Sequence, residues 1–110
     1  MDHIEIKTTV DGREEAERIA SALLERRLAA CVQIGGPIES RYWWRDEAGN
    51  EAIEVDSEFV CTIKTRRELF EQVAGAIREL HPYEVPEIVA VPLVTGSQDY
   101  LAWIDATVRT

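Results

Sequence analysis

The sequence predicts an α+β fold with the element order β-α-β-β-α-β and an additional C-terminal helix. Two windows carry apolar residues at the three- and four-residue spacing of an amphipathic helix. The segments around these windows are rich in β-branched and aromatic residues, which favour strands. This order is that of the ferredoxin-like or split βαβ arrangement, in which two helices cover one face of a four-stranded antiparallel sheet. The length of 110 residues predicts one domain over residues 1–110.

The first strand and the first helix are expected at the start of the chain. His3 to Val10 alternates weakly and is rich in isoleucine and threonine, which favours a strand. Asp11 and Glu14 have the spacing of a capping box, which predicts the start of a helix. A helix over Arg13 to Arg27 follows, because its apolar residues recur at spacings of three and four. These apolar residues are Ala16, Ile19, Ala20, Leu23 and Leu24.

A long antiparallel hairpin is expected in the middle of the chain. Leu28 to Arg45 has no helical period and favours a strand, and Gly35-Gly36-Pro37 predicts a bulge or bend within it. Ala48-Gly49-Asn50 is a turn signal. A second strand follows, in which Ile53, Val55, Phe59, Cys61 and Ile63 alternate with other residues. Strands usually run about 5–6 residues, whereas each arm here could exceed about ten.

The second helix is expected over Leu69 to Leu80. Thr65 and Glu68 have the spacing of a second capping box, and Pro82 cannot continue a helical hydrogen-bond ladder. The apolar residues between these signals recur at helical spacing. They are Leu69, Phe70, Val73, Ile77 and Leu80.

The last strand, expected over Pro86 to Val94, indicates an assembly. Ile88 to Val94 is apolar on both faces, whereas a strand with one solvated face alternates. Two helices can cover one face only, so either the C-terminal helix, which Ser97 can cap, or another subunit covers the other. The long hairpin is also hard to bury within one protomer. We therefore expect a homo-oligomer, and a monomer whose last helix covers the open face is the alternative.

The composition limits the partners of this domain. The chain has 12 Lys and Arg against 21 Asp and Glu, a formal net charge of −9, and 45% apolar residues. This excess of acid disfavours nucleic acid and anionic membranes, and the apolar content is too high for a disordered tail. The longest clean apolar run, Ile88 to Val94, is far shorter than the about 20 residues of a membrane span. The N-terminus lacks the pattern of a signal peptide, so we expect a cytoplasmic protein.

Five short sequence motifs, taken in order, resemble those of one known family. They are Leu28-Ala29-Ala30-Cys31-Val32, Tyr42-Trp43-Trp44, Glu58 ahead of Ile63-Lys64-Thr65, His81-Pro82-Tyr83-Glu84-Val85-Pro86-Glu87, and Tyr100-Leu101-Ala102-Trp103-Ile104. Over nearly the full chain they resemble the divalent-cation tolerance (CutA) family. The resemblance implies a ferredoxin-like fold, a tight homotrimer, kinship with the PII signalling proteins, and a link to copper and other divalent ions. It implies no catalytic reaction.

The resemblance implies copper binding at Cys31, His81 and Glu58. The residue types suit this role, because neutral imidazole binds copper and a thiolate suits Cu(I). The ordinary alternatives stay open: His81 can bond the last carbonyls of its helix, and Cys31 can be a small buried apolar residue. The hairpin tip is longer than is common in the family, which leaves the register of Glu58 open. Cys61 is expected in the core, and the Cys and His spacings fit no permanent zinc site.

Further candidates line a cleft beside the predicted metal ligands. Tyr83 follows Pro82 and can lie beside the His81 ring, and Glu84 and Glu87 can join it. Lys64, at the end of the second hairpin strand, is another candidate for binding a ligand there. The alternative is that the prolines of this segment only stiffen the entry to the last strand.

Aromatic residues and acidic residues concentrate on the hairpin. Trp43, Trp44 and Trp103 are candidates for a subunit interface, where large aromatics are favoured. We expect at least one of Trp43 and Trp44 there, because neighbours on a strand point to opposite faces. The stretch from Asp46 to Glu58 holds six acids and no base, which suits a solvated surface with weak affinity for divalent ions.

Two functions remain open from the sequence. The first is a cytoplasmic homotrimer of divalent-metal tolerance that binds copper or another divalent cation reversibly in clefts between subunits, without a permanent cofactor. The second is a PII-like signalling trimer that binds a small metabolite or a protein partner in the same clefts. An enzyme is not expected, because no GxSxG, P-loop or GxGxxG motif is present and no base is paired with a Ser or Cys nucleophile.

Overall fold

The structure is a computed structural model that describes residues 3–109. In this range four strands form one antiparallel sheet, and three α-helices accompany it. The elements in chain order are β1 (His3–Val10), α1 (Arg13–Glu25), β2 (Cys31–Arg45), β3 (Glu51–Arg66), a short 3-10 helix (Arg67–Leu69), α2 (Phe70–Leu80), β4 (Val89–Pro92) and α3 (Gln98–Thr107). The predicted α+β fold with a long hairpin and an extra C-terminal helix is confirmed.

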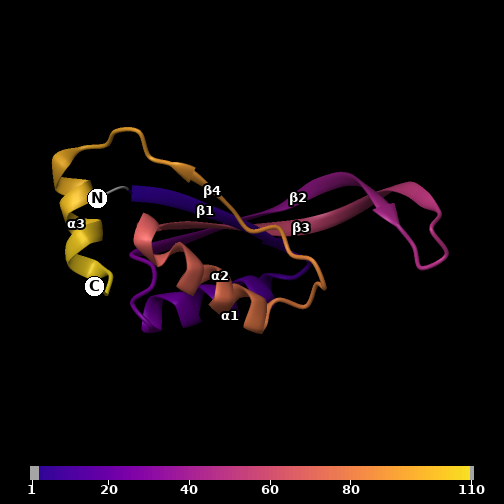
Figure 1. Ribbon diagram of the computed structural model, residues 1–110, viewed down its shortest axis with the longest axis horizontal. Coiled ribbons are helices and arrows are strands. Elements are labelled where there is room, and N and C mark those ends of the chain that lie inside the picture. Colours follow the sequence, from indigo (N-terminus) through magenta and orange to yellow (C-terminus); the bar gives the residue numbers. More distant parts are fainter. Residues whose placement is uncertain (1–2, 110) are drawn as a thin grey trace.

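The helices α1 and α2 lie side by side against one face of the sheet, whose strand order is β2-β3-β1-β4 (Figure 1). Alternate residues of β1 and β3 point into this layer, and Cys61 is fully buried there as expected. Burial raises the pKa of the Cys61 thiol to about 11. The largest fully buried side chains include Ile6, Ile19, Leu23, Ile63 and Ile77. The opposite face of the sheet stays open, and Val89 and Val91 on β4 are about half exposed.

The hairpin of β2 and β3 extends well beyond the helices (Figure 1), and the longest dimension of the molecule is 49 Å. Its pairing runs from Cys31 opposite Lys64 to Arg45 opposite Glu51, with a register shift between Gly35 and Ile38. Gly36 has φ +136°, and a Cβ atom there would lie 3.0 Å from the Glu58 carbonyl oxygen. The predicted bulge is confirmed, and Gly36 is required by both conformation and space.

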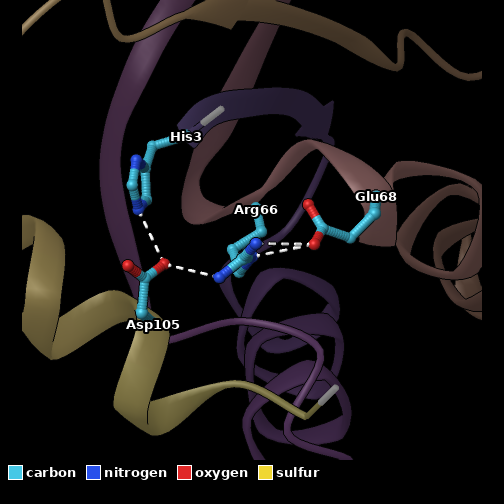
Figure 2. Close-up of polar contacts among 4 residues, drawn as sticks. All are labelled: His3, Arg66, Glu68 and Asp105. Atoms are coloured by element: carbon cyan, nitrogen blue, oxygen red, sulfur yellow. Dashed lines mark hydrogen bonds and ion pairs between the residues drawn. The ribbon is translucent and has the colours of Figure 1, made fainter. Parts of the chain in front are cut away.

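The C-terminal helix α3 packs at the end of the sheet where β1 begins and β3 ends (Figures 1 and 2). The carboxylate of Asp105 lies 2.8 Å from Nε2 of His3 and accepts a hydrogen bond of 2.9 Å from Arg66. Ile104 is fully buried in the core. The predicted cap is confirmed, because the Ser97 hydroxyl accepts from the Tyr100 backbone N–H at 3.3 Å. The helix therefore does not cover the open face of the sheet.

Both predicted capping boxes are wrong. The residue before α1 is Gly12, and no side chain caps that helix. The Thr65 hydroxyl is buried and donates instead to the Leu28 carbonyl at 2.6 Å, so it is unavailable to the second helix. β3 continues to Arg66, and a short 3-10 helix leads into α2. For Thr65, a tertiary contact decides where the polar group bonds.

The last strand is shorter than the predicted Pro86 to Val94. β4 pairs only with the segment of β1 from Ile4 to Lys7, although β1 continues to Val10, because the chain before Val89 is still the loop that leads from α2 to the sheet. The first helix also ends earlier than predicted, at Glu25, and Arg27 adopts a left-handed φ of 59°. None of the described helices is both long enough and apolar enough to cross a lipid bilayer.

Candidate functional site

His81 follows the last residue of α2, and its side chain turns toward β1 instead of toward the end of its own helix. Nε2 lies 2.8 Å from the Thr9 carbonyl oxygen, and the Tyr83 backbone N–H donates to Nδ1 at 3.2 Å. Because Nδ1 accepts the hydrogen bond from Tyr83, Nε2 carries the ring hydrogen and donates a hydrogen bond to the Thr9 carbonyl oxygen. His81 is 8% exposed, and both of its ring nitrogens have partners within the chain. A metal ion at either nitrogen must displace one of these hydrogen bonds.

Tyr83 connects His81 with Glu58. Its ring lies edge-on to the imidazole, with ring centroids 4.6 Å apart, and its hydroxyl donates to Glu58 Oε2 at 2.8 Å. Burial and the neighbouring carboxylate raise the pKa of Tyr83 above its usual value. Glu58 is only 7% exposed although it lies on the projecting hairpin. His81 and Glu58, two of the three predicted metal ligands, therefore lie on either side of the Tyr83 phenol.

Cys31 lies apart from these residues within one chain. It begins β2 and pairs with Lys64, which is six positions from Glu58 along β3, or about 20 Å at about 3.4 Å per residue. Within residues 3–109 there is no group of three or more His, Cys, Asp or Glu side chains that could hold a metal ion. A single described chain does not bring the three predicted ligands together.

The other predicted ligand-binding residues lie in different places. Lys64 is next to Cys31 on the open face, where its Nζ lies 3.3 Å from Glu5 and donates to Gln33 at 3.1 Å. It therefore lies far from His81. Glu87 lines a recess of about 360 Å³, together with Glu58, Tyr83 and four other residues. The remaining lining residues of this recess are Thr9, Ser40, Arg41 and Tyr42.

A second cleft, of about 430 Å³, lies between the hairpin and the loop that follows His81. We call it the acidic cleft. Its lining residues come from the β1–α1 turn, both hairpin strands and that loop. They are Asp11, Tyr42, Trp44, Glu54, Asp56, Ser57, Tyr83, Glu84 and Val85. The Tyr42 hydroxyl donates to the Asp56 carboxylate, and this bond raises the pKa of Tyr42 to about 12.

Sequence reasoning placed Glu84 beside a cleft but missed Tyr42 and Asp56. Strand alternation gave a signal for them, because residues 42, 44, 54, 56 and 58 share one face of a hairpin once its register is known. The register depends on the bulge at Gly35 and Gly36, which the sequence indicates only as a break.

The three tryptophans are all exposed in the single chain. Trp43 pairs with Ile53 and Trp44 with Ala52, so the two indoles lie on opposite faces of the hairpin. Trp43 is 68% and Trp44 52% exposed, and only Trp44 lines the acidic cleft. Trp103 lies on α3 beside Tyr100, with ring centroids 5.5 Å apart. Large aromatic side chains are favoured at interfaces, and all three remain available for one in the single chain.

Comparisons with known proteins give a consistent result. The family described as CutA1 divalent ion tolerance protein matches residues 4–107. The divalent-cation tolerance protein CutA of Archaeoglobus fulgidus is 44% identical over 107 residues, which cover 97% of this chain and 99% of that protein. The chloroplastic protein CutA 1 of Oryza sativa subsp. japonica is 35% identical over 106 residues, which cover 96% of this chain but only 57% of the longer relative.

A solved structure agrees with these sequence matches. The periplasmic divalent cation tolerance protein CutA from Archaeoglobus fulgidus superposes with a TM-score of 0.89 at 44% identity, and the match covers 97% of this chain and 99% of that chain. The five sequence motifs that predicted the family lie within the matched residues 4–107. The chain therefore belongs to the CutA1 divalent ion tolerance family.

Proposed function

We propose that this protein is a cytoplasmic homotrimer that binds divalent metal ions, copper among them, reversibly and so contributes to divalent-cation tolerance. The observation that carries the proposal is the family match over residues 4–107. The family is described by divalent ion tolerance and not by a reaction, which supports binding rather than catalysis.

The metal site that we propose uses His81, Glu58 and Cys31. His81 and Glu58 both contact Tyr83, which supports a shared site. Cys31 is about 20 Å from Glu58 along the strand. The site is therefore completed between subunits, where Cys31 of a neighbouring chain can approach. Because the His81 nitrogens already have partners, binding costs a hydrogen bond, which favours reversible binding.

The exposed apolar surface supports the proposed trimer. Val89 and Val91 on the open face, and Trp43 with Ile53 on the hairpin, are largely exposed in the single chain. Large apolar side chains left exposed on two separate parts of the chain are what subunit contacts would cover. Light scattering at micromolar concentration should give the mass of three chains of 12.5 kDa, and the mass of one chain would contradict the trimer.

Copper titration by calorimetry tests the site. We expect His81→Ala, Glu58→Gln and Cys31→Ser each to weaken Cu(II) binding about tenfold or more. His3→Gln is the matched control, since His3 lies at the other end of β1 beside Asp105. Unchanged copper binding in all three variants would remove these residues from the site. Fractionation of cells that carry the native gene tests the location, and recovery outside the cytoplasmic fraction would contradict it.

A second candidate function is a trimer that binds a small metabolite. The acidic cleft, which is lined from four chain segments and has the usual size of a ligand site, favours it. Native mass spectrometry of the protein taken directly from cell extract tests it. A retained metabolite supports this candidate, and a bound metal ion with no metabolite supports the first.

A further inference from the structure

Tyr83 forms hydrogen bonds to both His81 and Glu58. Its backbone N–H donates to His81 Nδ1 at 3.2 Å, and its hydroxyl donates to Glu58 Oε2 at 2.8 Å. His81 is 8% and Glu58 7% exposed, so more than nine-tenths of each residue is already buried within one chain. These two contacts are therefore made inside the single chain, whatever surface a neighbouring subunit covers.

The two ring nitrogens of His81 differ in how easily they can be freed. Nε2 donates to the carbonyl oxygen of Thr9, which lies on an inner strand of the sheet and pairs with Val60 of β3. Freeing Nε2 would leave this carbonyl without its donor or would disturb the strand. Nδ1 accepts instead from Tyr83, which lies between α2 and β4, outside the helices and strands. Nδ1 is therefore the nitrogen that a local movement can release.

The hydrogen bond to Thr9 is of the kind that orients a metal ligand. Histidines that bind a metal through one ring nitrogen donate the other N–H to a carbonyl or carboxylate, which fixes the ring and its tautomer. In His81 the Nε2–H group makes this bond, so the lone pair is on Nδ1. The imidazole is thus oriented to bind a metal through the same atom that accepts from Tyr83.

Glu58 is an independent observation that points to a cation. Its side chain is buried, and its hydrogen-bond partner in the part of the chain that the structure describes is the neutral Tyr83 phenol. Buried charges in proteins are ordinarily paired with an opposite charge or coordinate a metal. A movement of Tyr83 that exposes this carboxylate therefore favours the binding of a positive ion in the place of the phenol.

We propose that Tyr83 controls metal binding, because it holds both His81 Nδ1 and Glu58 in the metal-free protein. A divalent ion binds to this nitrogen and to the Glu58 carboxylate when the segment that carries Tyr83 moves away. The Tyr83 hydroxyl keeps its proton and bonds to water instead. The inference rests on the proposed metal site, of which it names the controlling residue and the ligating nitrogen.

Calorimetric titration with Cu²⁺ tests the control by the Tyr83 hydroxyl. Tyr83→Phe keeps the ring and the backbone N–H, so it frees only Glu58. We expect Cu²⁺ to bind this variant about tenfold more tightly than the original protein, because a hydrogen bond to a charged group no longer has to be broken. Tyr42→Phe is the matched control, since its hydroxyl donates to Asp56 on the same hairpin, and it should leave the affinity unchanged. A residue with a merely structural role would not tighten binding when it is truncated.

Nitrogen NMR of the histidine side chains tests the choice of Nδ1 and needs no variant. The chain has two histidines, so His3, which contacts Asp105, is the internal control. On addition of Zn²⁺, which is diamagnetic, we expect the His81 Nδ1 signal to shift while Nε2 keeps its hydrogen. The signals of His3 should stay unchanged. A shift at His81 Nε2 with Nδ1 unchanged would overturn the inference.

The results separate this inference from the proposed function. If His81→Ala left copper binding unchanged, the proposed site would be wrong and the control by Tyr83 would fall with it. If His81→Ala weakened binding but Tyr83→Phe bound copper no more tightly than the original protein, the site would stand and the control by Tyr83 would be rejected. If Tyr83→Phe does not fold, the response of the two His81 nitrogens to Zn²⁺ still decides.

Discussion

The two ends of the sheet treat their acidic residues differently. At the end where α3 packs, Asp105 contacts both His3 and Arg66, and Glu68 contacts Arg66 (Figure 2). The Arg66 guanidinium holds the pKa of the Glu68 carboxyl below its usual value. At the hairpin end, the Asp56 and Glu58 carboxylates accept from the hydroxyls of Tyr42 and Tyr83, which carry no positive charge.

This difference distinguishes carboxylates that hold the fold through ion pairs from carboxylates whose bonded partners are neutral phenols. A carboxylate beside a guanidinium has its partner already, so it stabilises the position of a helix. A phenol does not neutralise a carboxylate, and the acidic cleft is lined by four acids, of which Asp56 accepts from Tyr42, with no basic residue among its lining. The α3 end is therefore held by ion pairs, whereas the acids that line the cleft at the hairpin end have no basic residue among their lining partners.

The largest effect is expected where the hairpin bends toward the acidic cleft. Gly36→Ala should lower the free energy of unfolding by about 2–4 kcal/mol, because φ is +136° and the new Cβ would meet the backbone of β3. Gly35→Ala is the matched control, since no atom lies within 4 Å of its Cβ position. Urea denaturation at fixed protein concentration measures both. Equal effects at the two glycines would contradict the role of the bend.

A buried hydroxyl between the two ends should give a smaller effect of opposite sign. Thr8 Oγ1 is buried and has no hydrogen-bond partner in the described chain. Thr8→Val should therefore raise the free energy of unfolding by about 1 kcal/mol, because the desolvation cost of the hydroxyl is removed while the volume is kept. Thermal unfolding measures it. A destabilised variant would show that the hydroxyl has a partner in the native protein.

Neutralising one acid at each end should change the free energy of unfolding in opposite directions. Asp105→Asn should lower the free energy of unfolding by less than about 1 kcal/mol, since the carboxylate is partly exposed and screened. Glu54→Gln should leave stability unchanged or raise it by a few tenths of a kcal/mol, because its neighbours in the cleft are also acidic. Both differences should shrink at high salt. Destabilisation by Glu54→Gln would mean that this acid has a cationic partner.

The smallest expected effect is on the titration of a single side chain, Tyr42. The pKa of Tyr42 is raised to about 12 by its bond to Asp56, against the usual tyrosine value of 10.0. A raised pKa in the folded state contributes stability that is fully present below pH about 10 and is lost as pH rises toward about 12. Asp56→Asn should therefore lower the Tyr42 pKa and flatten this alkaline loss, as followed by tyrosinate absorbance. An unchanged titration curve would remove the Tyr42–Asp56 bond from the account.

Sequence reasoning predicted most of the fold because helices and strands leave periodic patterns of apolar residues. It failed where a polar group had two possible partners. Thr65 had the spacing of a helix cap, yet its hydroxyl bonds to Leu28, 37 positions earlier in the chain. β4 likewise pairs with only Ile4 to Lys7 of β1, and no pattern within residues 86–94 records that.

The candidate site was predictable only in part for a related reason. His81 and Tyr83 are near neighbours in the sequence, so their contact could be expected. Tyr83 and Glu58 are 25 positions apart, and their contact depends on the hairpin register and on the bulge at Gly36. The same register separates Cys31 from Glu58, although family resemblance implies that both bind copper.

Urea unfolding of two variants, measured together at low salt, tests the central claim most directly. We expect Glu54→Gln to keep its stability, because no basic residue lines the cleft around it. We expect Asp105→Asn to lose stability, because its carboxylate contacts His3 and Arg66. If Glu54→Gln unfolded more readily than Asp105→Asn, the difference between the two ends of the sheet would be wrong.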